Sequence, residues 1–458
     1  MGLWTEYPFG ICEAENIFFN TSVAPFTLSS NVFYSVSGSQ LLGVAESVTS
    51  FIIPWTVHDI VGLSFANQTS LESVSFEDPE NLRTIGSNAF VGCASLTEFP
   101  FEDLTSLGII QTSSFKNTAL TSVELPASVT RIEASAFEGC TNLTTLICHG
   151  DIAYIGENAF KGCPLAYVIF EGTTQQMASN AFDTVATRSR SGIAVYIADI
   201  DSWATTIFGN AKANPLSRPN SSLYYNSVLF DGVLPSSVVA VSPYAFYGCS
   251  SLENIRPTST TQIGQSAFEN CTALTTVDLR SLPNNVTFAQ DAFKGCTSVE
   301  KVIVGTTEQL LSFNYANSNA SPGGSVDGLL GGFVIETSTG PSTSEPLYDL
   351  TVLDDVSSLK PYTFMNSINF ASSSPEATLR LYAPSITLGD YCFQLGFNPD
   401  SLTSYVYTCY FAGTSTQFNA LFPVGNDTND DLKNAVHKVF AAEGLSYTQT
   451  GENQYSVS

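Results

Sequence analysis

A phrase built around Ala-Phe-x-Gly-Cys recurs along this chain and constrains its fold more than any other feature. Its first complete copy runs from Ile85 to Leu96. Complete or nearly complete copies centre on Phe90, Phe137, Phe160, Phe246, Phe268 and Phe293, and degenerate copies centre on Phe65, Phe115, Phe182, Phe364 and Phe393. Successive phenylalanines are 22 to 25 residues apart from Phe65 to Phe182 and again from Phe246 to Phe293. A fixed period in the low twenties predicts a solenoid of short stacked coils rather than one compact core.

A second apolar pattern follows each phrase and is typical of a strand. Examples are Leu143-x-x-Leu146-x-Cys148 and Leu274-x-x-Val277-x-Leu279. The last two apolar positions are separated by one outward position, which is the period expected when one face of a strand is buried. One short strand cannot bury that face alone. Stacking of the coils is therefore predicted to lay the strands into a parallel sheet, with the phenylalanines in an inward ladder.

The whole pattern, Ile-Gly-x-x-Ala-Phe-x-Gly-Cys-x-x-Leu-x-x-Val-x-Leu-Pro, resembles the BspA-like class of leucine-rich repeats over about residues 40–410. The resemblance implies a β-rich repeat solenoid: a leucine-rich-repeat-type parallel sheet with short helical or 3-10 turns, interrupted by inserted linking modules. Known members occur in anaerobic bacteria and in protists, and many are surface or secreted proteins that adhere to host or matrix proteins. The resemblance therefore implies a role in adhesion and recognition.

The ladder is interrupted twice, at Asp183–Pro235 and at Thr306–Ser358. The first stretch resembles the linking module that BspA-like proteins insert between runs of repeats. A Gly-Thr-x-x-Gln-apolar phrase beginning at Gly172, Gly305 and Gly413 supports a larger super-repeat. We therefore predict an N-terminal cap, a first repeat block, a second block with its preceding linking module, a degenerate third block and a C-terminal cap, at residues 1–40, 41–200, 201–335, 336–424 and 425–458.

Two further segments carry local predictions. Ser321–Ser344 is rich in Gly, Ser, Thr and Pro and is expected to be a long surface loop. The C-terminal cap is expected to hold a helix from Asn429 or Asp430 to Glu443, followed by a hairpin over Leu445–Ser458. This helix is predicted from four apolar residues whose spacing would place them on one face: Leu432, Val436, Val439 and Phe440.

The balance of charge narrows the classes of partner. Acidic residues outnumber basic ones by 42 to 16, a net charge of -26. Few cations are available to replace phosphate counterions, so nucleic acid is excluded as a partner. No stretch approaches the roughly 20 apolar residues of a membrane span, and the first residues show no signal peptide. The composition therefore predicts no membrane insertion. The resemblance implies an extracellular or cell-surface protein, with a cytoplasmic protein as the alternative.

Six of the ten cysteines occupy the same repeat position. They are expected to form a buried, reduced ladder: Cys93, Cys140, Cys163, Cys249, Cys271 and Cys296. Adjacent coils bring such residues to about the Cα separation of a disulfide, roughly 5 Å, so a few bridges are the alternative. No CxxC pair or closed cluster suggests zinc.

No constellation of residues predicts catalysis. The three histidines, His58, His149 and His437, are far apart in sequence, and Cys148 and His149 would face opposite sides of a strand. Two groups of aspartates could ligate calcium but lack the EF-hand spacing, so solvated surface acids are expected: Asp199 and Asp201, and Asp427, Asp430 and Asp431. We predict no enzyme, no cofactor and no metal site.

The partners are expected to be other proteins, or the extracellular matrix or host surface. The linking modules break the coil period and are predicted to protrude, which makes Trp203, Tyr224 and Tyr225 the candidate binding residues. The alternative is that these aromatics pack against the neighbouring coil and that the sheet face, with Thr145 and Thr276, binds the partner. A structural protein that self-associates into a coat or filament, and an intracellular scaffold, are the rival functions.

Overall fold

A computed structural model describes residues 26–29, 32–35, 37–44, 47–184, 192–305 and 307–322. Beyond these it describes 333–335, 349–352, 358–359, 377–381, 387–388, 407–411, 414–421, 437–440, 445–451 and 454–457. The chain forms two compact units, residues 1–230 and 231–458, which are described separately.

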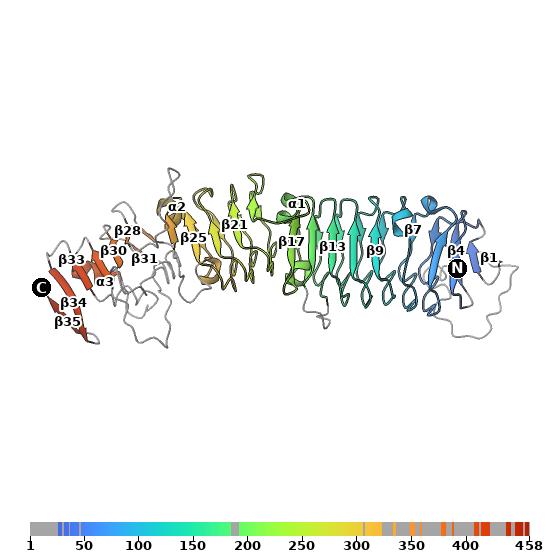
Figure 1. Ribbon diagram of the computed structural model, residues 1–458, viewed down its shortest axis with the longest axis horizontal. Coiled ribbons are helices and arrows are strands. Elements are labelled where there is room, and N and C mark those ends of the chain that lie inside the picture. The colour runs from blue at the N-terminus through green and yellow to red at the C-terminus, as the bar shows by residue number, and fades with distance from the viewer. Residues whose placement is uncertain are drawn as a thin grey trace. The chain divides into compact units, whose positions relative to one another are not determined.

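Unit 1 is a solenoid in which the long strands of successive coils pair into one sheet and the short strands into another (Figure 1). The long-strand sheet consists of β9 (Ser122–Leu125), β11 (Thr145–Cys148), β13 (Tyr167–Phe170), β15 (Ala194–Ile197), β17 (Ser222–Tyr225) and, antiparallel at one edge, β18 (Val228–Leu229). The short-strand sheet consists of β8 (Ile109–Ile110), β10 (Arg131–Ile132), β12 (Tyr154–Ile155), β14 (Gln176–Met177) and β16 (Ile207–Phe208). The predicted parallel solenoid is thereby confirmed.

The first coils of unit 1 contain two smaller sheets. One comprises β1 (Phe26–Ser29), β2 (Val32–Ser35), β3 (Gln40–Val44), β5 (Asp59–Ile60) and β7 (Thr84–Ile85), and the other pairs β4 (Ser50–Ile53) with β6 (Ser73–Phe76). The turns contain α1 (Ile200–Thr205) and the 3-10 helices η1 (Pro79–Asn81), η2 (Phe101–Asp103), η3 (Ala211–Ala213) and η4 (Pro215–Ser217).

The phenylalanines form the inward ladder that the repeat predicts. In unit 1, neighbouring rings from Phe65 to Phe182 stack with centroids 4.8 to 5.6 Å apart. In unit 2, Phe268 stacks with Phe246 at 5.2 Å and with Phe293 at 5.1 Å. These rings are almost completely buried, because each coil covers the face that the previous one leaves open. Offset stacking at this spacing adds to the free energy gained from burial.

The first part of unit 2 repeats this arrangement. Its long-strand sheet comprises β19 (Val233–Leu234), β21 (Asn254–Pro257), β23 (Thr276–Asp278), β25 (Lys301–Val304) and β27 (Phe333–Ile335). Its short-strand sheet comprises β20 (Ala240–Val241), β22 (Gln262–Ile263), β24 (Thr287–Phe288) and β26 (Asn314–Tyr315), and its turns contain α2 (Thr307–Ser312) and η5 (Ser318–Ala320).

The rest of unit 2 ends in antiparallel strands. Its strands are β28 (Asp349–Val352), β29 (Ser358–Leu359), β30 (Ala377–Leu381), β31 (Thr387–Leu388), β32 (Tyr407–Phe411), β33 (His437–Phe440), β34 (Leu445–Gly451) and β35 (Gln454–Val457), and its helix is α3 (Ser415–Ala420). The predicted hairpin is present as β34 and β35. The predicted helix is wrong at His437–Phe440, because these residues form β33 and pair with β32 and β34. Leu432 and Val436 lie outside the described residues.

The predicted protrusion of the linking modules is also wrong where the structure describes them. In the first module, β15 pairs residue for residue with β13, and β17 pairs with β15, so both continue the solenoid. In the second module, β27 pairs with β25, although it lies within the predicted loop Ser321–Ser344. The rest of that loop after residue 322 lies outside the described residues.

A longer repeat in the order of elements is present in both units. Helices α1 and α2 begin at residues 200 and 307, and the strands before them begin at residues 194 and 301, so both pairs are 107 positions apart. The Gly-Thr-x-x-Gln phrase opens α2 and α3, whereas its copy at Gly172 precedes strand β14 instead. Helices thus begin at two of the three copies of the phrase, and the division into repeat blocks that it suggested stays a prediction.

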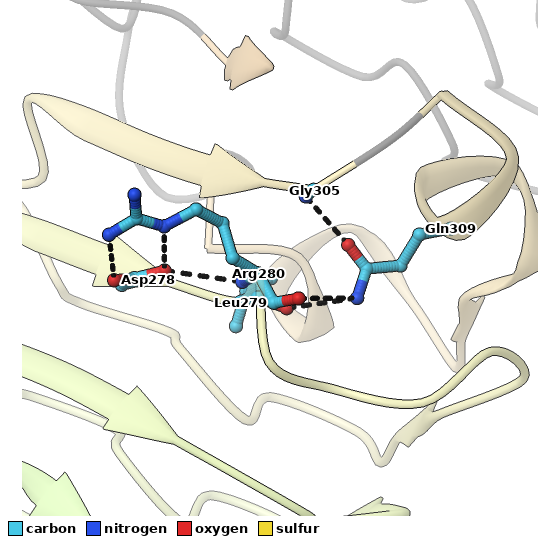
Figure 2. Close-up of polar contacts among 5 residues, drawn as sticks. All are labelled: Asp278, Leu279, Arg280, Gly305 and Gln309. Carbon is cyan, nitrogen blue, oxygen red and sulfur yellow. Dashed lines mark hydrogen bonds and ion pairs between the residues drawn. The ribbon is translucent and has the colours of Figure 1, made fainter. Parts of the chain in front are cut away.

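Equivalent positions of α1 and α2 fix each helix to the coil before it. Ser202 of α1 donates to the carbonyl of Thr174 and accepts from its N–H, both at 2.8 Å. At the position 107 residues later, Figure 2 shows Gln309 accepting from the N–H of Gly305 at 2.8 Å and donating to the carbonyl of Leu279 at 3.1 Å. In both helices a polar side chain therefore pairs with backbone groups of residues outside the helix, which holds the helix in place.

Candidate protein-binding face

The outward side of the long-strand sheet in unit 1 presents a row of side chains in register. Pairing of the six strands aligns Glu124, Ile147, Ile169, Tyr196, Tyr224 and Leu229. Successive side chains of a strand point to opposite faces, so this row turns outward while residues such as Leu146 and Val168 enter the core. Tyr167 lies in the next outward row, two residues before Ile169. We call Ile147, Tyr167, Ile169, Tyr196 and Tyr224 the tyrosine face.

Aromatic side chains cover much of this face. The rings of Tyr196 and Tyr224 stack with centroids 4.5 Å apart and an interplanar angle of 14°. Tyr167 is 50% exposed, and at the edge of the sheet Val228 and Leu229 are 68% and 45% exposed. Apolar surface gathered in this way marks a site of interaction more reliably than single exposed residues do.

Acidic groups border the tyrosine face on three neighbouring coils. His149 contacts Glu124 through Nε2 and Glu171 through Nδ1, each at 2.8 Å. Only the imidazolium has two N–H donors, so both contacts are hydrogen bonds when His149 is protonated. The bonds to Glu171 and Glu124 accordingly raise the pKa of His149 above its ordinary value. Asp151 accepts from the N–H and the hydroxyl of Thr173, and these bonds lower the pKa of its carboxyl.

The strands of this sheet carry no lysine or arginine from β9 to β17. The corresponding sheet of unit 2 differs, since Arg256 is exposed on β21 and Lys301 lies on β25. Arg280, just after β23, is paired with Asp278 at 2.7 Å (Figure 2). The outward face in unit 1 therefore combines apolar surface with negative charge, whereas that in unit 2 is of mixed charge.

The three predicted binding residues have different environments. Trp203 is only 1% exposed and packs with Phe170 and Phe208, so its role is the alternative one, packing against the neighbouring coil. Tyr224 and Tyr225 are half-buried, and Tyr224 belongs to the tyrosine face. Thr145 and Thr276, the residues named for the alternative in which the sheet face binds the partner, lie at outward positions of β11 and β23.

The sequence reasoning missed Tyr167, Tyr196 and the ion pairs of His149. The signal for Tyr196 was available, because Ala194-Val195-Tyr196-Ile197 has the same apolar alternation as the strands before it. The contacts of His149 join residues 22 and 25 positions apart, and they are visible only once the strand register is known.

The described residues show little that points to metal or catalytic chemistry. Within the described ranges, no group of three or more His, Cys, Asp or Glu residues is arranged to hold a metal ion. Asp199, considered as a calcium ligand, instead caps α1 by accepting from the N–H groups of Asp201 and Ser202. Cys148 is buried and His149 lies on the other side of the chain, as predicted. Among the helices in the described part of the chain, none has the length and apolarity needed to cross a bilayer.

Solved structures with similar architecture are leucine-rich repeat proteins from bacteria. A leucine-rich repeat protein from Bacteroides ovatus has a TM-score of 0.48 and 19% identity, covering 88% of this chain and 89% of its own. The pneumococcal vaccine antigen PcpA has a TM-score of 0.43 and 16% identity, with 91% and 98% covered. A leucine rich cell surface protein from Faecalibacterium prausnitzii has a TM-score of 0.36 and 16% identity, with 87% and 98% covered. No curated protein matches the chain.

The sequence profile of the BspA type leucine rich repeat region matches the chain in six copies, over residues 38–109, 59–188 and 219–320. These matches cover more than half of the chain and mark it as a protein-interaction repeat protein. The chain therefore belongs to the BspA-type leucine-rich repeat family.

Proposed function

We propose that this protein is a non-catalytic adhesion and recognition protein, exposed at a cell surface or secreted, that binds other proteins through the tyrosine face. The observation that carries the proposal is the register of Tyr196, Tyr224 and Leu229 with Ile147 and Ile169 on one outward side of a sheet.

The physical properties of this face support the proposal. Its side chains project from hydrogen-bonded strands above the packed ladder of phenylalanines, so little backbone order remains to be imposed on binding. Tyrosine offers a large contact area at a low cost in side-chain entropy, and it is enriched among the residues that dominate binding energy. A face of this kind is suited to a flat protein surface or an extended segment.

The proposed location follows from the family, because the resemblance implies surface or secreted proteins. An antibody raised against the folded chain should label intact, unpermeabilised cells of the source organism, or should detect the protein in their medium. Labelling that requires permeabilisation would instead favour the intracellular scaffold.

Light scattering of the purified full chain separates adhesion from assembly. A monomeric mass that is unchanged over a hundredfold range of concentration supports the adhesion protein. Ordered growth in mass with concentration would contradict it and favour a structural protein that forms a coat or filament.

A further inference from the structure

We infer that the tyrosine face takes an arginine-bearing, otherwise apolar segment of a partner protein, lying across the strands. The inference rests on the proposed function and adds the chemistry of the partner. It is carried by the stacked pair Tyr196 and Tyr224, the acidic border at Glu124 and Glu171, and the absence of cations on the strands β9 to β17.

The stacked tyrosine pair offers partly exposed aromatic surface to a planar cation. The rings of Tyr196 and Tyr224 stack from neighbouring strands, and Ile169 is the register partner of Tyr196 on its other side. Both rings remain partly exposed, so a guanidinium can lie over their outward surface. A guanidinium is attracted to the face of a tyrosine ring and is only weakly hydrated, which favours it over the ammonium of lysine at such a position.

Glu171 lies where it can pair with that guanidinium. Tyr196 is the register partner of Ile169, and Glu171 is two residues beyond Ile169 along the chain. Glu171 directly follows the end of β13, at the same outward parity as Ile169, so a long side chain that lies over Tyr196 points toward it. Glu171 is 54% exposed in spite of its bond to His149. An arginine that lies on Tyr196 therefore meets a carboxylate at the border of the same face.

The other outward face in unit 1 holds an internal example of this recognition. On the short-strand sheet, the guanidinium of Arg131 lies 4.7 Å from the centroid of the Tyr154 ring, and an Arg131 nitrogen is 2.9 Å from Glu133. One arginine is thus held between the ring of Tyr154, in β12, and the carboxylate of Glu133, which directly follows β10. The tyrosine face has tyrosines and neighbouring carboxylates, and its strands β9 to β17 carry no arginine.

The apolar part of the partner follows from the rest of the row. Ile147 and Ile169 lie on one side of Tyr196, and Tyr224 and Leu229 lie on the other. Neighbouring strands are about 4.8 Å apart, and the side chains on one side of an extended segment are about 6.6 Å apart. A segment that crosses the strands therefore places side chains over and between members of the row. Apolar residues two positions from an arginine would share its side of the segment and contact the row. Acidic segments would be repelled by Glu124 and Glu171.

The test measures binding of the full chain to two labelled peptides by fluorescence anisotropy. One peptide repeats Arg-Ser-Val-Ser, which places arginine and valine on the same side of an extended chain. The other has citrulline in place of each arginine, which keeps the shape and removes the charge. The arginine peptide should bind at least tenfold more tightly, and its affinity should fall as sodium chloride rises. Tyr196→Leu and Glu171→Gln should each weaken its binding about tenfold, whereas Tyr154→Leu, on the short-strand sheet, should leave it unchanged.

Three results would overturn the inference. Equal affinity for both peptides, with loss of binding in Tyr196→Leu, would keep the tyrosine face as a binding surface but exclude the cationic partner. Tight binding of the arginine peptide that Tyr196→Leu and Glu171→Gln leave unchanged would show attraction to the acidic chain as a whole. Absence of binding at millimolar peptide would exclude the predicted chemistry. The surface labelling described above tests the proposed function independently of all three.

Discussion

The thiol of Cys140 donates a hydrogen bond to the backbone carbonyl of Phe115, one coil earlier, with a sulfur–oxygen distance of 3.1 Å. The same bond joins Cys163 to Phe137 at 3.1 Å, and Cys296 to Phe268 at 3.1 Å. At Cys93, Cys140, Cys163, Cys271 and Cys296 the repeated cysteine therefore links its coil to the phenylalanine of the coil before it. The carbonyls of Phe137 and Phe268 also accept from the N–H of the cysteine in their own coil, so the thiol of the next coil occupies the second acceptor site of each carbonyl.

These bonds predict that the ladder cysteines are unreactive in the folded protein. Burial raises the pKa of the Cys93 thiol to about 12, and it also raises the pKa values of Cys163 and Cys271. The hydrogen bond with Cys163 lowers the pKa of Cys140, but its complete burial keeps reagents away from it. Since the thiolate is the reactive form, iodoacetamide should not label these residues in the native state and should label them after denaturation without reductant. Peptide mass spectrometry that finds a Cys140–Cys163 or Cys249–Cys271 crosslink in the native sample would contradict the reduced ladder.

The phenylalanine ladder is expected to supply much of the stability of each unit. Phe137→Ala in unit 1 and Phe268→Ala in unit 2 should each lower the free energy of unfolding by about 3–5 kcal/mol, because each leaves a cavity between stacked rings. Urea denaturation followed by circular dichroism measures the change. Tyr167→Ala, at a half-exposed position, is the control and should cost much less. Losses below about 1 kcal/mol at both phenylalanines would contradict an interior ladder.

The glycine before the ladder cysteine is expected to be required at its backbone conformation. Gly139 has φ +76°, and an added Cβ would collide with the Oδ1 atom of Asn117 in the preceding coil. Gly139→Ala should destabilise unit 1 by about 1–3 kcal/mol. Gly108→Ala provides a matched control, since a Cβ there has only an ordinary contact at 3.9 Å with Ser128. The control should change stability by less than about 1 kcal/mol, and an equal effect at both glycines in urea denaturation would refute this account of the turn.

The ion pairs of His149 predict a dependence of stability on pH. The hydrogen bonds to Glu171 and Glu124 raise the pKa of His149 in the folded state above its ordinary value of 6.5. A raised pKa means that the bonds stabilise the fold fully below pH 6.5, and that this contribution is lost as the pH rises through the folded value. The midpoint of urea denaturation should therefore fall over this range, by a small amount because the three side chains are partly exposed.

Titration of the His149 ring protons by NMR tests directly whether Glu124 and Glu171 raise the pKa of His149. The pKa of His149 should lie above 6.5 in the native chain and should fall in Glu171→Gln and in Glu124→Gln. A native value at or below 6.5 would show that the imidazole does not donate to both carboxylates in solution.

The sequence was sufficient to predict the coil period, the inward phenylalanines and the strand at Thr145–Cys148. These features repeat, so each copy supports the assignment of the others. The protrusion predicted for residues after Asp183 was wrong. The Ala-Phe-x-Gly-Cys phrase is absent there, but the apolar alternation of the strands continues. In that coil Trp203 and Leu216 are the buried apolar residues, and they fill the core without the repeated phrase.

The predicted C-terminal helix was wrong for a different reason. Val439 and Phe440 fit the spacing of one helical face, but they are also residues that favour strands. Pairing of His437–Phe440 with strands on both sides outweighs the helical periodicity of the segment. The tyrosine face was partly predictable, since Tyr224 was named from sequence, but its stacking with Tyr196 depends on register between strands that are 28 residues apart.

The central claim is that the tyrosine face, rather than another outward surface of unit 1, meets the partner protein. Site-specific photocrosslinking tests it most directly, with a benzophenone amino acid placed at Tyr224 in one variant and at Tyr154 in another. Each variant is exposed to the surface and matrix proteins that the source organism encounters, and the products are identified by mass spectrometry. The account predicts protein adducts at position 224 and none at position 154. Adducts of equal yield at both positions, or adducts at position 224 only with other copies of this chain, would contradict it.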